Sequence, residues 1–399
     1  MTVATLKNLI VVDLSQNRAG PYCTRLFSGF GARVIKVEDP ATGDPLRNCG
    51  PFFADQPGIE RGIPFHWLNC GKESITLNLK TQRGAAILSD LLRRADVLVE
   101  SFAPGDLALL GLPRDKLTEI NRRLIVTSIS QFGQDGPYAD YAADEAVMYA
   151  MSGGMASTGE SDRPPLLAGP AIAQYTAGLQ AYIATLMAIF RRGADGSGEA
   201  IDLSVFESAL ENVEIHLAEF AYDGKIARRN GDEHLLVPWR CYPCRDGQSA
   251  VIGGPVRHWE RAAELFEEPR LATPELAHMA DRMVHRREVE SLFRPWLMRH
   301  NKKDIYHQAQ AVGLAFGYLA TLAEVLDSPQ HSARDFFQES EPHPEVGPLR
   351  MCGAPFRVGS DSWRIGRAPC LGEQTRQVLS EFLGYQIDEI QHLTEQGIV

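Results

Sequence analysis

The sequence predicts an α/β protein with one large domain and one smaller one. Its 399 residues exceed the ~100–200 residues of a usual domain. Short apolar runs alternate with segments of helical apolar spacing through the first third, a pattern typical of βα units around a parallel sheet. Hydrophobic residues make up 44% of the chain and charged residues 23%, which is the balance of a folded globular protein.

The first forty residues predict one βαβ unit. The apolar run 9–12 suits a buried parallel strand, and Pro21 lies where the first turn of a helix tolerates proline. Gly31 is placed to end that helix, and 33–38 should form the second strand. Because Gly29 and Gly31 close a helix rather than open one, we reject a dinucleotide-binding loop.

Further strands are expected at 75–79, 97–99 and 124–129, with a helix through 86–92. Ligands of a parallel sheet bind outside the carboxyl ends of its strands. These ends are 15–19, 39–44, 101–105 and 131–136.

The remainder of the chain is predicted to be more helical. A long uncharged helix should cover 171–192; Gln174, Thr176, Gln180 and Thr185 interrupt it, which favours a buried core helix over a membrane span. A strand at 201–205 and a helix to about 222 should follow. An amphipathic helix near 375–383 and a short terminal segment complete the prediction.

Charge and cysteine usage exclude several functions. The formal net charge of −11 argues against nucleic acid as a partner. Residues 1–130 carry a net charge of +3 and the rest −14, so a polyanionic small molecule should bind near the first third. Seven irregularly spaced cysteines and an N-terminus without an apolar signal core predict a reduced, cytoplasmic protein with no membrane partner.

Two conspicuous pairs have structural interpretations. Cys241 and Cys244 have metal-like spacing, but no second ligand pair lies at an ordinary distance, so we expect a structural turn and no metal site. Asp144 and Glu145 are adjacent acids in a loop that opens a helix, where negative charge complements the helix dipole.

Motifs along nearly the whole chain resemble those of the class III CoA-transferases, the formyl-CoA transferase and carnitine-dehydratase-like (CaiB/BaiF) family. Their number, order and spacing carry the resemblance. The matching segments are VDLS (12–15), AGP (19–21), GARVIKVE (31–38), GD (43–44), SITLNLK (74–80), ADVLVESF (95–102), SISQFGQ (128–134), SGG (152–154) and PCLGE (369–373).

The resemblance implies a Rossmann-like large domain built from both chain ends, 1–205 and 333–399, and a smaller α+β domain at 225–330. Linkers would lie at 206–224 and 331–332, and two subunits would interlock as a dimer. A CoA thioester would be the substrate, with no permanently bound cofactor.

The motif positions also imply which residues contact CoA. They are Arg18, Ala19, Leu77, Lys80, Ser101 and Phe102. Arg18, Lys36, Lys72 and Lys80 flank the predicted strand ends, where they would face the CoA phosphates.

Three positions depart from the family pattern. The catalytic aspartate of the transferases falls at Gln174, within 169–178. A neutral amide cannot form the mixed anhydride that the aspartate forms with the acyl group. Asp39 and Leu109 occupy positions where formyl-CoA transferase uses arginines on CoA, so CoA binding should be weakened as well.

These departures favour a subunit without its own nucleophile, which acts with a homologous catalytic subunit that carries the aspartate. In the family, benzylsuccinate CoA-transferase pairs two related subunits of which one lacks the aspartate, and this suggests succinyl-CoA as donor and a carboxylic acid as acceptor. One alternative is a homodimer with altered chemistry through Glu145. A racemase is disfavoured, because its His and Asp positions hold Asp144 and Gln174. The other alternative is a CoA-thioester binding protein without turnover.

Overall fold

The computed structural model describes residues 5–233, 236–247, 249–253, 258–358 and 363–399. They form two compact units. The first comprises Met1–Gly154, Leu167–Lys225 and Ser332–Val399, and the second Met155–Leu166 and Ile226–His331. The assignment of separate functional domains to 1–205 with 333–399 and to 225–330 stays a prediction.

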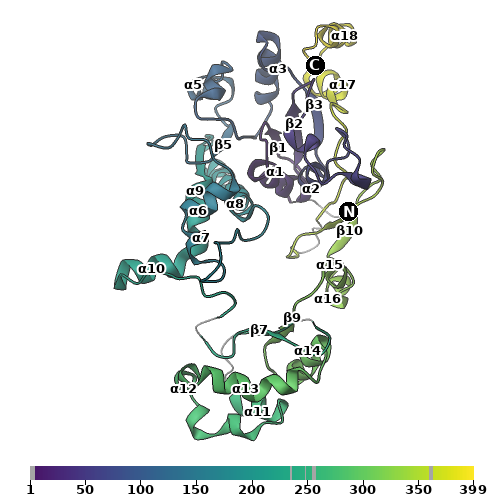
Figure 1. Cartoon of the computed structure of the whole chain (residues 1–399). Coiled ribbons are helices and arrows are strands. Elements are labelled where there is room, and N and C mark those ends of the chain that lie inside the picture. The colour runs from purple at the N-terminus through teal and green to yellow at the C-terminus, as the bar shows by residue number, and fades with distance from the viewer. Residues whose placement is uncertain (1–4, 234–235, 248, 254–257, 359–362) are drawn as a thin grey trace. The chain divides into compact units, whose positions relative to one another are not determined.

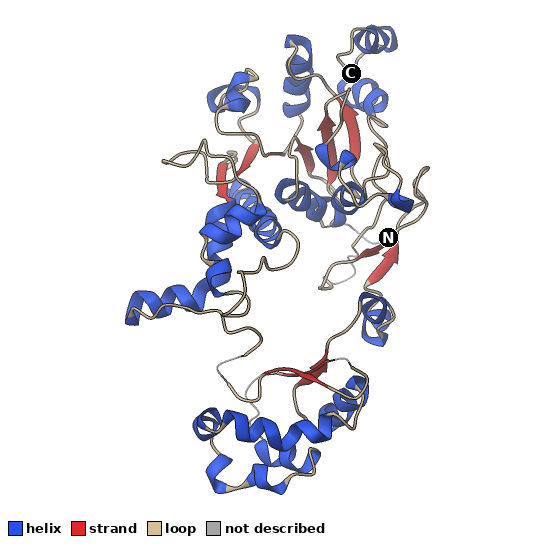
Figure 2. Cartoon of the chain, viewed as in Figure 1, coloured by secondary structure: helices blue, strands red, loops and turns tan. Residues whose placement is uncertain are grey.

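A six-stranded parallel sheet in the order β3-β2-β1-β4-β5-β6 organises the first unit (Figures 1 and 2). It confirms the predicted α/β class and parallel sheet. The strands are β1 (Ile10–Asp13), β2 (Arg33–Glu38), β3 (Glu73–Thr76), β4 (Val97–Glu100), β5 (Ile125–Ser130) and β6 (Ala200–Ser204). A separate antiparallel pair is formed by β10 (Phe337–Glu339) and β11 (Arg350–Cys352).

Helices of the first unit connect the strands and extend to the C-terminus. They are α1 (Ala19–Gly29), α2 (Ile63–Asn69), α3 (Gln82–Leu92), α4 (Asp106–Leu109), α5 (Arg114–Ile120), α6 (Glu145–Met151), α8 (Ile172–Asp195), α9 (Val205–Leu210), α10 (Glu214–Asp223), α17 (Thr375–Gln377) and α18 (Ile387–Glu395). Helix α7 (Gly154–Ser157) begins at the last residue of the first unit's first stretch and continues into the second unit. A π-helical segment, Val378–Leu383, continues α17.

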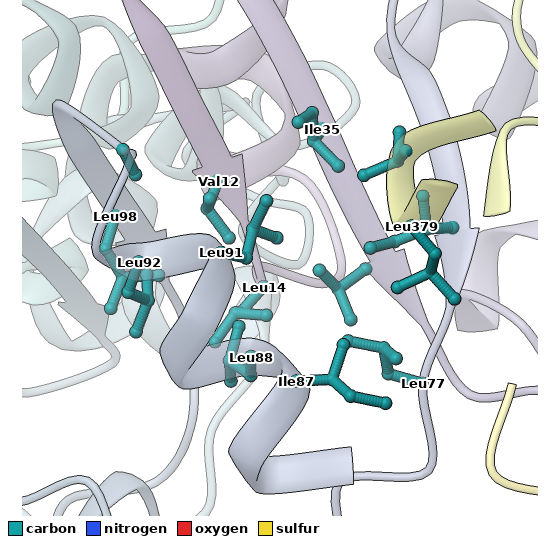
Figure 3. Packing of buried hydrophobic residues seen from close by; sticks show 14 of the residues in the cluster. Val12, Leu14, Ile35, Leu77, Ile87, Leu88, Leu91, Leu92, Leu98 and Leu379 are labelled. Atoms are coloured by element: carbon teal, nitrogen blue, oxygen red, sulfur yellow. The ribbon is translucent and has the colours of Figure 1, made fainter. Parts of the chain in front are cut away.

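Apolar clusters cover both faces of the sheet. On one face, Val12 and Ile35 of the strands pack with Leu88 of α3 and with Leu379 near the C-terminus (Figure 3). On the other face, α1 and α8 pack against the strands. At 178 only glycine fits, because a Cβ there would lie 2.4 Å from the main-chain oxygen of Ala19. This close crossing ties the start of α1 to the first turns of α8.

The second unit is built on the antiparallel strands β7 (Arg240–Pro243), β8 (Ser249–Ile252) and β9 (Phe316–Tyr318). Its apolar core includes Phe266, Phe293 and Trp296. Its helices are α11 (Trp259–Leu265), α12 (Met279–Val284), α13 (Arg286–Leu297), α14 (Lys302–Ala311) and α15 (Leu322–Leu326). Helix α16 (Pro329–Ala333) contains the boundary along the chain at which the second unit ends and the first resumes.

The structure differs from the sequence-based prediction in a few elements. Cys241 lies in strand β7 rather than in a turn, and none of the seven cysteines, all of which are described, forms a disulfide. The terminal segment contains the unpredicted helix α18, and the turn-rich stretch after β4 contains α4 and α5. Among the described residues, we find no helix with the length and apolarity that crossing a membrane requires.

Candidate active site

A cavity of about 380 Å³ lies at the carboxyl ends of β1, β4 and β5. Three residues predicted from the family motifs line it: Ala19, Ser101 and Phe102. Gln174, which the sequence motifs place at the predicted nucleophile position, lines the same cavity. A larger cavity of about 570 Å³ beside α5 and β6 contains none of the predicted site residues within the described chain. We therefore take the smaller cavity as the candidate active site.

Gln174 belongs to the first turn of α8 and is 8% exposed. Its side-chain Nε2 donates a hydrogen bond to Oε1 of Gln131, at 3.3 Å. A neutral amide, itself held by a second amide, thus occupies the position that the sequence motifs predict for the family's carboxylate. Neither group can act as a nucleophile toward a thioester in the manner of a carboxylate.

The carboxylate of Glu145 serves the N-terminus of α8. One oxygen accepts from the main-chain N–H of Ala173 at 2.9 Å, and the other accepts from that of Gln174 at 3.1 Å. A negative charge here satisfies two N–H groups that the helix leaves unpaired, and it complements the helix dipole. Glu145 therefore fixes the turn that carries Gln174.

Asp144 caps α6, as the sequence predicts for a helix-opening acid. Its Oδ1 accepts from the main-chain N–H of Val147 at 3.1 Å. The adjacent acids Asp144 and Glu145 thus fix two different helices, α6 and α8.

The remaining predicted CoA contacts do not line the cavity in the described structure. Arg18 is the partly buried N-cap residue of α1. Lys80 is exposed beyond the end of β3. Leu77 is 1% exposed and packs in the apolar core, so its side chain is not available to a ligand.

Lys36 and Lys72, which the sequence suggested for the CoA phosphates, are instead buried in an ion network. Lys72 Nζ lies 2.9 Å from Oδ2 of Asp13, and Lys36 Nζ lies 2.7 Å from Oδ2 of Asp44. Burial would raise the pKa of Asp13, but the charges of Lys36 and Lys72 outweigh it and hold that pKa well below its usual range. Burial lowers the pKa of Lys72 to about 8, against the attraction of Asp13.

This network fixes the loop between β1 and α1. Lys36 Nζ donates to the main-chain oxygen of Ser15 at 2.8 Å, and the main-chain N–H of Ser15 donates to Oδ1 of Asp13 at 2.9 Å. The next two residues, Gln16 and Asn17, line the cavity. Lys36 and Asp13 are therefore positioning residues for the cavity wall.

Asp39 and Leu109, at the two positions where the family pattern has arginines, offer no positive charge to a ligand. Asp39 accepts hydrogen bonds from the main-chain N–H groups of Ala41 and Thr42, at 2.9 and 3.1 Å, and so fixes the turn after β2. Leu109 ends α4 and is 85% exposed.

A separate cluster joins Glu60, His343 and Cys370, whose ligand-type atoms lie within 4.8 Å of one another. His343 Nδ1 accepts from the main-chain N–H of Glu345 at 3.2 Å, so the neutral imidazole carries its proton on Nε2, the atom that faces Cys370 Sγ at 3.4 Å. Arg47 already pairs with Glu60 at 2.8 Å. We interpret the cluster as a hydrogen-bonded one, because a metal would need that nitrogen unprotonated.

Several cavity residues were not singled out from the sequence. Gln16 and Asn17 follow β1, and Ser130 and Gln131 end and follow β5. Their positions at or just after the ends of predicted strands could have indicated them as cavity residues, because ligands of a parallel sheet bind at these ends. The exposed Asp140 also lines the cavity, from a loop that no sequence pattern connects with it.

Comparison with known proteins agrees with this fold. Residues 6–375 match CoA-transferase family III. The chain is 31% identical to succinyl-CoA–D-citramalate CoA-transferase of Chloroflexus aurantiacus, over 99% of this chain and 98% of the relative. It is 32% identical to succinyl-CoA:(R)-benzylsuccinate CoA-transferase subunit BbsE of Thauera aromatica, over 98% and 97%.

A solved structure supports the same assignment. The crystal structure of a CaiB/BaiF family protein from Brucella suis superposes with a TM-score of 0.84 at 30% identity, covering 96% of this chain and all of the other. With a parallel sheet, a cavity at its carboxyl edge and matches along nearly the whole sequence, this chain belongs to CoA-transferase family III.

Proposed function

We propose that this chain is the subunit of a hetero-oligomeric class III CoA-transferase that lacks the nucleophile, and that a homologous subunit carries the aspartate. The observation that carries the proposal is Gln174, a neutral amide in the cavity at the end of the sheet. The relatives named as succinyl-CoA-dependent enzymes, one of them a subunit, support succinyl-CoA as the donor and a carboxylic acid as the acceptor.

The chemistry explains why a partner is needed. In the proposed reaction, the partner's aspartate attacks the succinyl thioester, forms a mixed anhydride and releases CoA thiolate. The thiolate attacks the aspartyl carbonyl, which gives an aspartyl-CoA thioester and free succinate. The acceptor carboxylate then attacks the aspartyl-CoA thioester, which gives a second mixed anhydride and releases CoA thiolate. The thiolate attacks the acceptor's carbonyl, which forms the acceptor's CoA thioester and regenerates the aspartate. Every step requires a carboxylate that can be acylated, and Gln174 is not one.

Apolar side chains on one side of α8 support a protein partner. Leu179, Ile183, Met187 and Phe190 lie at helical spacing and are 44%, 49%, 68% and 88% exposed. The opposite side of the helix is buried against the first unit. We call these four residues the α8 stripe. A contiguous exposed apolar stripe is typical of an interaction surface, and the proposed partner subunit is its occupant here.

Covalent trapping tests the proposal. The chain and its homologous partner are co-expressed, incubated with succinyl-CoA and treated with hydroxylamine, and each subunit is analysed by mass spectrometry. We expect the hydroxylamine-derived mass change on the partner alone. In the isolated chain, Gln174→Asp should create a trappable site, whereas Gln174→Asn should not.

Three results would contradict the proposal. Adduct on the wild-type form of this chain would show that it carries a nucleophile of its own. Transferase activity of the isolated chain that Glu145→Gln abolishes would favour the homodimer with altered chemistry. CoA-dependent thermal stabilisation without turnover in either preparation would favour a binding protein.

A further inference from the structure

Ser130 carries an unused hydrogen-bonding group at the wall of the candidate cavity. It ends β5, lines the cavity and is 7% exposed. Its Oγ is buried without a hydrogen-bond partner among the described residues. Buried hydroxyls nearly always have a partner, so an unpaired one on a residue that lines a cavity is available to a molecule bound there.

The cavity wall selects for a neutral group. The polar side chains that share the cavity with Ser130 are amides and hydroxyls, apart from the carboxylate of Asp140. Among the described lining residues there is no lysine, arginine or histidine. A carboxylate or phosphate would therefore lose its hydration without gaining a cation, and Asp140 would repel it. A thioester carbonyl is neutral and needs only a donor.

The neighbouring amides leave such a thioester intact. Gln131 follows Ser130 in the chain and accepts a hydrogen bond from Gln174 at 3.3 Å. The same cavity thus offers hydrogen-bonding groups, while its nucleophile position holds an amide. A thioester bound beside Gln174 therefore meets no carboxylate nucleophile at that position.

We propose that the Ser130 hydroxyl donates a hydrogen bond to the carbonyl oxygen of an acyl-CoA thioester, and that this chain thereby retains intact thioester in its own site. The proposal rests on the proposed function, because it assigns a ligand to the site that lacks the nucleophile. It makes Ser130 a binding residue that distinguishes a thioester from free CoA and from a free acid.

Two unreactive analogues of butanoyl-CoA test this. In one, CH₂ replaces the sulfur and the carbonyl is kept as a ketone; in the other, S-butyl-CoA, CH₂ replaces the carbonyl. Calorimetric titration of the full chain should show the ketone binding about 3- to 10-fold more tightly, the range expected for one hydrogen bond. Ser130→Ala should remove this preference and leave the thioether affinity unchanged.

Two further variants serve as controls. Ser130→Thr keeps a hydroxyl and should keep the preference. Ser89→Ala makes the same change on α3, where Ser89 Oγ donates to the main-chain oxygen of Ala85, and should have no effect on either affinity. Equal affinities in the wild type, a preference that survives Ser130→Ala, or no binding of either analogue would overturn the proposal. Adduct on this chain in the trapping experiment would instead overturn the proposed function, and the carbonyl preference could still be measured.

Discussion

Lys72 and Lys80 lie just before and just beyond β3 and have opposite environments. Lys72 Nζ is buried and bonded to Asp13, Thr24 and Asn69, at 2.9, 2.7 and 2.8 Å. Lys80 is exposed. Two residues of one type therefore have unrelated roles, one inside the ion network that fixes the β1–α1 loop and one at the surface.

Removing the buried ammonium should destabilise the first unit strongly. Lys72→Met leaves Asp13 with Lys36 at 4.0 Å as its nearest cation, and breaking a buried ion pair costs about 3–5 kcal/mol. Urea denaturation followed by circular dichroism measures the change. Lys80→Met is the matched control and should change stability by less than about 0.5 kcal/mol. Equal stabilities of the two variants would show that the network contributes nothing.

At the scale of residues, the sequence shows that position 174 holds no carboxylate, but it does not show which contacts the surrounding side chains make. Position 174 can be read directly as an amide. That the carboxylate of Glu145 binds two N–H groups of α8 depends on a contact across 28 residues, which no local pattern contains. For the same reason, the sequence places Lys36 and Lys72 near the edge of the sheet but does not show that both are buried and paired with Asp44 and Asp13.

At the scale of elements, helix α8 has one side that packs in the core and one side that is exposed and apolar. One side packs on α1 and α9, and the other presents the α8 stripe. Its first turn carries Gln174, so the helix links the proposed subunit interface with the candidate site.

A charge placed in the α8 stripe should weaken assembly without unfolding the chain. Ile183→Glu puts a carboxylate where the partner would bury an apolar side chain, and we expect the dissociation constant for the partner to rise about tenfold or more. Ile387→Glu in α18 is the matched control, because Ile387 is 46% exposed and Ile183 is 49% exposed. Light scattering after size-exclusion chromatography measures the assembly. Equal assembly of both variants would exclude the stripe as the interface.

Elements with strong local patterns were predictable and those dependent on packing were not. Strand β2 has the predicted bounds, because its alternating residues and the flanking glycine define it locally. The start of α8 is within one residue of prediction. Helix α18 was missed because it has only two buried residues, Ile390 and Leu393, and the apolar cluster that they join consists mostly of residues before position 125.

At the scale of the whole molecule, stability should fall in two stages as the pH is lowered. Burial lowers the pKa of His343 from 6.5 to about 4, so the unfolded chain takes up the proton first and stability is lost between these values. A hydrogen bond from Arg367 lowers the pKa of Glu373 from 4.5 to about 2, and one from Lys302 does the same for Glu324. These carboxylates stabilise the fold above pH 4.5 and lose that effect toward pH 2.

Urea midpoints at pH 7, 5 and 3 measure both stages. His343→Gln should remove part of the loss between pH 7 and 5, while the exposed His392→Gln should leave it unchanged. Because Glu373 belongs to the first unit and Glu324 to the second, the lower stage should affect both units. A midpoint that stays constant from pH 7 to 5 would contradict the assignment of the upper stage to His343.

The buried ion network also changes how the charge of the first third should be understood. Lys36, Arg47 and Lys72 are 0–5% exposed and paired with Asp44, Glu38 and Asp13, so the network carries no net charge and the formal excess of +3 comes from the other residues of this segment. Mobile counterions cannot reach these groups. Any dependence of phosphate-ligand affinity on ionic strength should therefore come from cations outside the network, with Lys80 and the partly buried Arg18 as the predicted contacts that salt can screen.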